Sequence, residues 1–316
     1  MSTNTYFAYA RHALVAGFRH LGIKSGDEIA VPELICRDVL ASISTIGAIP
    51  RFYPVDQHLR PASRGQAESP SAVLMVNYFG FPQDISDFGN LWPNAPIVED
   101  NAHGYLSKDS DGANLGTRTP VGVTSIRKTI YLPEGAVLST KNPLDPLLVE
   151  PPDERKPSLS LRIRRATAIC ERSSGLPTQQ ISRALIRGLR TLQSGSALPK
   201  SNAYTETVLP AQKSISKWSL NHIESLDCEK EVERRRNLFT EVAAFAWSES
   251  VQPVFGSLPS GCSPYGFAFY GSEVPNSLQR LVRRLHCEII TWPDLPSSIV
   301  VAPDHHYRRL KVVNFL

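Results

Sequence analysis

One stretch, residues 97–140, limits more than any other what this chain can fold into and what it can do. It opens with I-V-E-D-N-A-H-G-Y, in which a short apolar run leads to Asp100, and His103 follows three residues later. About one βαβ unit further on, Lys128 stands between a serine and a Glu-Gly turn. Pyridoxal phosphate (PLP) chemistry requires a lysine amine that forms a Schiff base and a carboxylate that pairs with the pyridinium nitrogen. The stretch therefore predicts a PLP site.

Around this stretch, apolar runs of strand length alternate with amphipathic segments. Continuous apolar strands that alternate with helices indicate a parallel sheet covered on both faces. In such sheets ligands bind at the carboxyl ends of the strands, which is where Asp100 falls. The expected elements are a helix at 7–22, a strand at 28–31, a helix at 33–46, and strands at 49–55, 72–78 and 95–99.

Composition excludes several classes of protein. At 316 residues with 41% hydrophobic content, the chain is long enough for a large core and two lobes. A net charge of +4 does not require a nucleic-acid partner, and no apolar run approaches the ~20 residues of a membrane span. The N-terminus does not resemble a secretory signal. Five scattered cysteines without C-x-x-C spacing argue against a structural metal or disulfides, so we expect no metal and a cytoplasmic location.

The motif residues resemble the DegT/DnrJ/EryC1/StrS family of sugar aminotransferases. The family motif is an I-E-D-x-A-[QH]-x-x-G-like segment, then a serine, the Schiff-base lysine, and E-G-G six residues beyond. Asp100, His103 and Lys128 fall in this order, and Glu134 lies six residues after the lysine. The segment Y-F-G-F-P-Q-D at 78–84 also matches the family's Y-G-x-P-x-D. The resemblance implies the type I PLP-dependent transferase fold: a mostly parallel central sheet with helices on both faces, plus a small C-terminal α/β lobe.

The resemblance also implies roles for these residues. Lys128 would hold the cofactor, Asp100 would pair with the ring nitrogen, and His103 would lie beside the ring and its phenolic oxygen. Structural roles are also open. An aspartate at position 100 suits the start of a helix or turn, a role compatible with the functional one. His103 is alternatively a histidine of the core.

The rest of the cofactor site departs from the family pattern. Ser125 is the expected phosphate ligand, although it lies closer to Lys128 than the usual S-F-x-x-x-K spacing. Arg11 stands in the helix start where the family has Gly-Thr, and it is either a bidentate phosphate ligand or a solvated arginine. Cys36 takes the place of the aromatic that stacks on the ring, near which we still expect it, as a small buried residue. Arg127 either affects the lysine pKa, meets the phosphate, or forms a surface ion pair.

Beyond Thr140, a proline-rich stretch marks a boundary, and we divide the chain into three parts. These are a large PLP-binding α/β domain at 1–145, a linker with a basic helical segment at 146–227, and a long helix with a small α/β lobe at 228–316. The elements expected here are helices at 160–173, 178–193, 228–247 and 275–286, and strands at 265–271, 287–292 and 298–302.

The predicted activity is amino transfer by a ping-pong mechanism, from an amino acid donor such as glutamate to a keto sugar that is carried on a nucleotide. The resemblance implies a homodimer with sites at the subunit interface. The G-x-N-Y-R and L-P-x-H segments of the family are missing, so two alternatives stay open: another PLP reaction, such as elimination or C–C bond chemistry, or a non-catalytic homologue that binds or regulates. The basic residues between Arg162 and Arg190 are either a solvated face or, as we hypothesise, contacts to the acceptor's diphosphate, and nucleic acid is not the expected partner.

Overall fold

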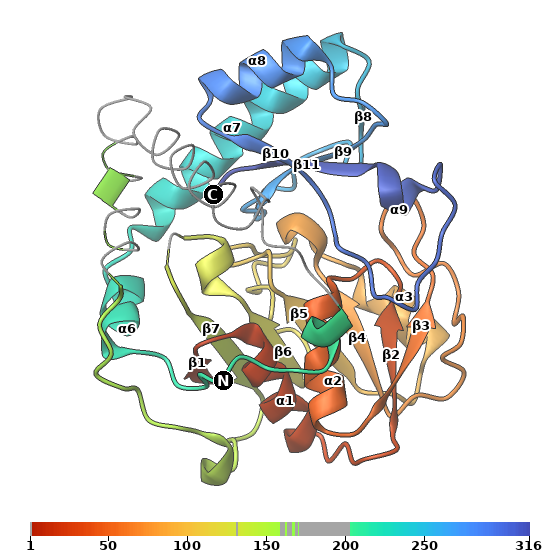
Figure 1. Cartoon of the computed structure of the whole chain (residues 1–316), viewed down its shortest axis with the longest axis vertical. Coiled ribbons are helices and arrows are strands. Elements are labelled where there is room, and N and C mark those ends of the chain that lie inside the picture. The colour runs from red at the N-terminus through yellow and green to blue at the C-terminus, as the bar shows by residue number, and fades with distance from the viewer. Residues whose placement is uncertain (1, 131, 159–161, 163–165, 168–169, 171–202) are drawn as a thin grey trace.

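The computed structural model describes residues 2–130, 132–158, 162, 166–167, 170 and 203–316, and the statements below concern these residues (Figure 1). They form two sheets, one built from the first half of the chain and one from the last quarter. A continuous apolar core contains residues from both sheets and from the helices around them.

The larger sheet has seven strands in the order β1-β7-β6-β5-β4-β2-β3. Strands β3, β2, β4, β5 and β6 run parallel, whereas β7 is antiparallel to both β6 and β1. The strand β4 is buried along its whole length, as expected for the middle of a parallel sheet. The strands are β1 (Thr3–Phe7), β2 (Glu28–Pro32), β3 (Ile49–Tyr53), β4 (Ala72–Val76), β5 (Ile97–Asn101), β6 (Val121–Thr124) and β7 (Ala136–Thr140).

Helix α1 (Ala10–His20) packs on β6 and β7 and contacts α2 (Leu40–Thr45). The connection from β2 to β3 and the connection from β4 to β5 step in opposite directions across the sheet. Because such crossovers are right-handed, α2 and α3 (Ile85–Leu91) lie on opposite faces. The fold class predicted from the sequence is confirmed: the sheet is mostly parallel and lies in an α/β architecture.

The four strands expected in the large sheet lie within two residues of their expected bounds, whereas the two helices expected there are shorter than expected. The helix expected at 7–22 is α1, and the helix expected at 33–46 is reduced to the 3-10 turn η1 (Arg37–Val39) followed by α2. Residues 33–36 are not helical. The Glu33 amide donates a hydrogen bond to the Tyr53 carbonyl, so the pairing of β2 with β3 continues one residue beyond β2 before the chain turns.

The chain leaves the large sheet through η4 (Pro146–Leu148). It re-enters the described part through η5 (Ala203–Glu206) and α6 (Lys217–Glu224). The long helix α7 (Cys228–Ser248) begins at Asp227, whose side chain accepts a hydrogen bond from the Lys230 amide.

The smaller sheet has four antiparallel strands in the order β10-β11-β9-β8, and helix α8 (Asn276–Arg284) packs against α7. The strand expected at 298–302 is wrong: those residues form an irregular loop in which Val300 is 87% exposed. The strand that completes the sheet is the last one, which pairs on both sides. The strands are β8 (Gln252–Pro253), β9 (Gly266–Tyr270), β10 (Glu288–Thr291) and β11 (Leu310–Asn314), with the short helix α9 (His306–Arg309) before β11.

No described helix combines the length and the apolar character that crossing a membrane requires. The helices expected at 160–173 and 178–193 lie almost entirely outside the described residues. The three-part division at residues 145 and 227 stays a prediction.

Candidate active site

The carboxyl ends of five strands meet at one edge of the large sheet. Strands β2, β4, β5 and β6 are parallel, and β1 runs in the same direction because two antiparallel pairings separate it from β6. The segments that follow these strands therefore gather at the same edge, which is where α/β sheets bind ligands. They carry all six residues predicted for the site.

Lys128 ends the 3-10 turn η3 (Ile126–Lys128), which begins directly after β6 and Ser125. Its Nζ lies 3.4 Å from Nε2 of His103. Burial lowers the pKa of the Lys128 amine, while the charges of Cys36 and Asp100 act in the opposite direction. An amine with a lowered pKa is more available as a nucleophile near neutral pH.

Asp100 lies within β5 and is 4% exposed. Its Oδ1 accepts a hydrogen bond of 2.9 Å from the Ala102 amide, so the carboxylate also stabilises the turn that follows the strand. Burial raises the pKa of this carboxyl, and the positive charge of Lys128 and the Ala102 hydrogen bond partly offset the effect. The structural and functional roles considered for Asp100 are thus compatible, because one oxygen serves the turn and the other has no hydrogen bond to the described residues.

His103 is buried in a group of aromatic rings. It stacks on Tyr265 with ring centroids 4.6 Å apart and lies parallel to Phe79 at 5.6 Å, while the Trp292 ring meets it edge-on at 5.4 Å. Burial, and then the charge of Lys128, lowers the pKa of His103 well below its usual range, so the ring is neutral. Its Nδ1 is buried and has no partner among the described residues.

The three remaining predicted residues flank this group. Ser125 is 1% exposed, and its hydroxyl does not cap the turn that it precedes. Cys36 lies at the start of η1, close enough for the Lys128 charge to act on its pKa, which burial raises. The expectation was a small buried residue, whereas the Cys36 side chain is half-buried. The raised pKa of its thiol argues against a thiolate there. Arg11 lies in the first turn of α1 and pairs with Asp38 at 3.5 Å.

The lysine turn of the site is held in place partly by residues that the sequence analysis did not identify. Arg235 of α7 is fully buried, pairs with Glu231 at 2.8 Å, and donates hydrogen bonds to the carbonyl oxygens of Pro264 and of Thr129, the residue after Lys128. Together with Tyr265, these contacts bind the lysine turn to the C-terminal part of the chain. Their sequence separation of more than a hundred residues leaves no local pattern by which to find them.

Glu134, quoted above only as part of the family motif, has a defined structural role. Its buried carboxylate accepts hydrogen bonds from the Ser216 amide (2.7 Å), from the Ser219 hydroxyl (3.2 Å) and from Gln212. These partners lie at the start of α6, so Glu134 ties the returning chain to the loop that follows Lys128.

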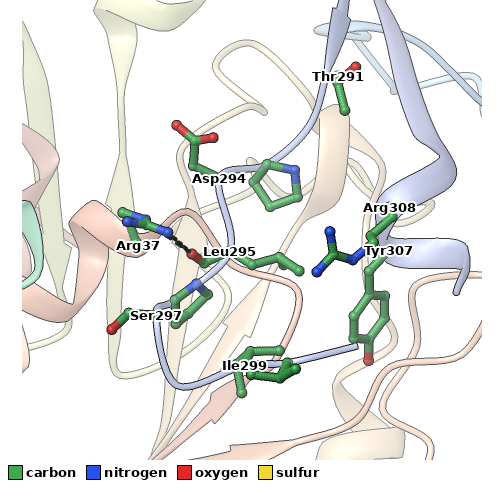
Figure 2. Close-up of a pocket in the computed structure, with 11 residues that line it drawn as sticks. Arg37, Thr291, Asp294, Leu295, Ser297, Ile299, Tyr307 and Arg308 are labelled. Atoms are coloured by element: carbon green, nitrogen blue, oxygen red, sulfur yellow. Dashed lines mark hydrogen bonds between the residues drawn. The ribbon is translucent and has the colours of Figure 1, made fainter. Parts of the chain in front are cut away.

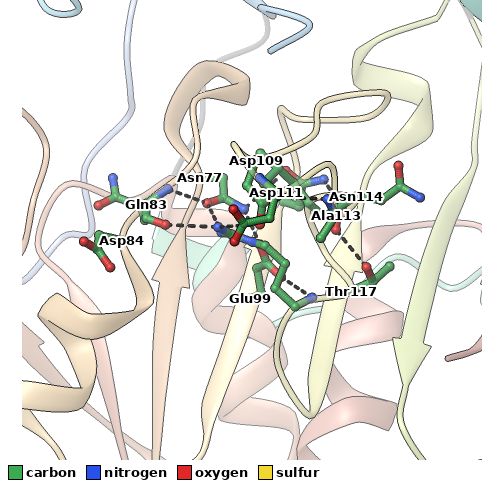
Figure 3. A network of polar contacts seen from close by, with 12 residues as sticks. Asn77, Gln83, Asp84, Glu99, Asp109, Asp111, Ala113, Asn114 and Thr117 are labelled. Carbon is green, nitrogen blue, oxygen red and sulfur yellow. Dashed lines mark hydrogen bonds and ion pairs between the residues drawn. The ribbon is translucent and has the colours of Figure 1, made fainter. Parts of the chain in front are cut away.

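On the other face of β5, a second polar network supports the loop between β5 and β6 (Figure 3). Glu99 is completely buried and accepts from Arg118 Nε at 2.7 Å and from Asn77 Nδ2 at 2.8 Å. Arg118 also donates to the Gln83 carbonyl at 3.1 Å and to Asn77 Oδ1 at 3.1 Å. This network ties the 78–84 segment, quoted above as a match to the family motif, to the strand that carries Asp100.

A pocket of about 470 Å³ opens beside the site, between η1 and the loop after β10 (Figure 2). Arg37 donates to the Leu295 carbonyl from Nε at 3.0 Å and from Nη2 at 2.7 Å, which fixes one wall. None of the six predicted site residues lines this pocket. The pocket is connected to the site through the chain: Arg37 follows Cys36, and Pro293 follows Trp292, which contacts His103.

The basic stretch cannot be placed in this picture. Arg162 is exposed, and the other arginines named in the hypothesis lie outside the described residues. These are Arg164, Arg165, Arg172, Arg183, Arg187 and Arg190.

The chain has the fold of the type I PLP-dependent transferases, and the candidate site lies at one edge of its large sheet. Residues 7–145 match the model of the DegT/DnrJ/EryC1/StrS aminotransferase family, and this segment contains all six predicted site residues. The resemblance stated from the motif residues is therefore confirmed.

Two curated proteins are similar to the same half of the chain. Protein MosB of Rhizobium meliloti is 28% identical over 142 residues, which are 42% of this chain and 27% of that protein. The GDP-perosamine synthase of Escherichia coli O157:H7 is 30% identical over 131 residues, 39% of this chain and 36% of that protein. The matched region thus spans about a third or less of the length of these curated relatives.

Solved structures are similar over nearly the whole chain. The 3-amino-5-hydroxybenzoic acid synthase has a TM-score of 0.63 at 14% identity, over 98% of this chain and 80% of that chain. A DegT DnrJ EryC1 StrS aminotransferase from Brucella abortus has a TM-score of 0.60 at 16% identity, with 98% and 80% covered. An E. coli GDP-4-keto-6-deoxy-D-mannose-3-dehydratase, solved with bound hydrated PLP, has a TM-score of 0.55 at 15% identity, with 92% and 74% covered. At these identities the likeness shows the fold alone.

Proposed function

We propose that the chain is a PLP-dependent aminotransferase that moves an amino group from an amino acid, such as glutamate, to a keto sugar carried on a nucleotide. The observation that carries the proposal is the convergence of Asp100, His103 and Lys128 at the edge of the sheet: Asp100 and His103 are buried, the half-buried Lys128 lies 3.4 Å from His103 Nε2, and His103 Nδ1 has no partner among the described residues. Buried polar atoms without partners are rare in folded proteins and point to a missing ligand. The family match over residues 7–145 supports the same reading.

The donor set fits the cofactor. Lys128 supplies an amine for the aldehyde carbon, Asp100 a carboxylate for a protonated ring nitrogen, and His103 a neutral ring edge beside them. Ser125 offers an unbonded hydroxyl one turn away from the lysine. When bound, PLP supplies an electron sink for bond changes at the carbon that carries the amino group.

The residues of the chain then have separate tasks. The lowered pKa of Lys128 makes it easier for its Nζ to release a proton than for an ordinary lysine, and the neutral His103 beside it adds no competing charge. The positive charge of Lys128 favours the ionised form of Asp100 and partly offsets the burial that raises the pKa of this carboxyl. The aromatic rings of Phe79, Tyr265 and Trp292 exclude water from this side of the site.

The acceptor is the less constrained half of the proposal. The pocket of Figure 2 adjoins the site and contains Arg37 and Arg308, so it suits the polar part of a phosphorylated acceptor. We also propose that the protein is a homodimer, as the resemblance to the family implies. A cytoplasmic location remains a prediction from the cysteine pattern.

The test starts with the purified full chain and added PLP. We expect the protein to turn yellow, to lose the colour when glutamate is added, and to recover it when a nucleotide-linked keto sugar accepts the amino group. A Lys128→Ala variant should bind the cofactor without the covalent spectrum. Absence of any spectral change in the wild type would contradict the proposal and favour a non-catalytic homologue.

A second reaction type is open to the same site, because dehydratases are among the proteins with this fold. Product analysis with the same keto sugar separates the two reactions. Amino transfer yields an amino sugar, whereas elimination yields a deoxy sugar without nitrogen.

A further inference from the structure

Arg127 has a positive charge that the described part of the chain does not balance. Its guanidinium lies over the Tyr9 ring, 5.2 Å from the centroid, and its Nε is buried without a hydrogen-bond partner. Within the described residues, no carboxylate lies within ion-pair distance of this guanidinium. An arginine stays protonated in proteins, and a buried charge is costly unless it is paired. The surface ion pair considered for Arg127 is therefore not formed.

The neighbouring charges are already engaged. Arg11 pairs with Asp38 at 3.5 Å, and Lys128 and Asp100 act on each other's pKa. The three cations are Arg11, Lys128 and Arg127, and the two carboxylates are Asp38 and Asp100. One positive charge is therefore not balanced by these groups, and it is that of Arg127. An anionic ligand would complete the balance.

Other donors converge on the same place. The Arg127 amide donates to the Gly135 carbonyl at 3.1 Å, and the Gly135 amide donates to the Ala8 carbonyl at 2.8 Å, so Gly135 links the lysine turn to the segment that leads into α1. The Tyr9 side chain does not cap α1, a helix of 11 residues, which leaves its N-terminal end without a side-chain acceptor. Ser125 is nearly fully buried, and its hydroxyl does not cap the turn that it precedes.

We propose that Arg127, rather than Arg11, supplies the cationic contact to the phosphate of the cofactor, together with the Ser125 hydroxyl and the N-terminal end of α1. This inference rests on the proposed function and deepens it. The Arg127 guanidinium would replace the phosphate contacts that the Gly-Thr helix start provides in the family. Its several N–H donors match the geometry of a phosphate dianion. Arg11, for which the sequence left a phosphate contact and a solvated position open, instead pairs with Asp38.

The same chemistry would also suit a phosphate group on the acceptor, so the test must separate the two sources. It compares the affinity of the full chain for PLP with its affinity for pyridoxal, which lacks the phosphate, by absorbance titration. A residue that contacts the cofactor phosphate affects only the PLP affinity. A residue that merely supports the fold affects both.

Arg127→Met should weaken PLP binding by about tenfold to a hundredfold, the range expected for a lost charge-assisted hydrogen bond, and should change pyridoxal binding by less than about threefold. Arg127→Lys keeps the charge without the fork and should recover part of the loss. The control is Arg19→Met, at an exposed arginine of α1, which should leave both affinities unchanged. Circular dichroism of each variant checks that it folds, and the lysine variant keeps the test informative should the methionine variant not fold.

Three results would overturn the inference. The first is an equal loss of PLP and pyridoxal affinity in Arg127→Met, which makes the residue structural. The second is a PLP-specific loss in Arg11→Met with none in Arg127→Met. The third is an unchanged PLP affinity with weaker binding of a nucleoside diphosphate, which assigns Arg127 to the substrate. Failure of the wild type to bind PLP at all is a different result, because it removes the proposed function itself.

Discussion

Two adjacent carboxylates on β5, Glu99 and Asp100, have opposite surroundings. Glu99 is completely buried, and both of its oxygens accept hydrogen bonds, from Arg118 and Asn77. Asp100, on the other face of the strand, has one hydrogen bond, to the Ala102 amide. A fully partnered buried group stabilises a fold, whereas a partly satisfied one reduces stability and is kept where a ligand completes it. The difference separates the structural face of the strand from its functional face.

Breaking the Glu99 network should have the largest effect on stability. Arg118→Met leaves the carboxylate buried without its cation, so we expect the free energy of unfolding to fall by about 3–5 kcal/mol, measured by urea denaturation. The exposed Arg280→Met serves as the control and should change stability by less than about 0.5 kcal/mol. A loss below about 1 kcal/mol in Arg118→Met would mean that the network does not support the fold.

Asp100→Asn should show the opposite pattern, with a functional loss and little structural cost. The amide oxygen still accepts from Ala102, but it cannot keep a ring nitrogen protonated, so we expect turnover to fall by about 100-fold or more, about 2.7 kcal/mol in barrier height. Because burial raises the pKa of Asp100, its contribution to stability is present at acid pH and lost as pH rises through that pKa. The apoprotein of the variant should therefore be no less stable than the wild type at neutral pH. Undiminished amino transfer would contradict the role of Asp100.

The pH dependence of cofactor capture sharpens the comparison. Only the unprotonated amine attacks an aldehyde, so the rate should rise about tenfold per pH unit and level off below the pH at which an ordinary lysine amine does, because the pKa of Lys128 is lowered. Asp100 raises that pKa, so Asp100→Asn should move the profile to lower pH. Stopped-flow absorbance gives the rates, with N-acetyl-lysine as the reference amine. A shift to higher pH in the variant would contradict the assigned charges.

The smallest expected effect concerns the ring that stacks on His103. Tyr265→Phe keeps the stack and should change PLP affinity less than about threefold, whereas Tyr265→Leu loses an aromatic contact of roughly 1 kcal/mol and should weaken binding by about fivefold. Fluorescence titration measures both. Equal affinities in the two variants would show that the stack does not position His103.

The sequence predicted the site better where the chemistry is local. Asp100 lies near the end of β5, His103 follows that strand, and Lys128 follows the neighbouring parallel strand β6, so their order along the chain already places them at one edge. Tyr265 and Arg235 escaped prediction because they reach the site from the C-terminal part through tertiary contacts that no periodicity encodes.

The wrong strand has a physical cause. The apolar run at 298–302 was taken for a strand, but the central position in the small sheet is filled by β11, so the run is left as an exposed loop. The sequence left Arg11 open as a phosphate ligand or a solvated arginine, because it shows the helix start and not the Asp38 partner at 3.5 Å.

Reduction with borohydride, followed by peptide mapping, tests the central claim most directly. Reduction fixes the cofactor to the amine that holds it, and the account predicts a pyridoxyl label on Lys128, whose Nζ lies 3.4 Å from His103. A label on Lys108 or Lys141, or no label on a protein that has bound PLP, would contradict it.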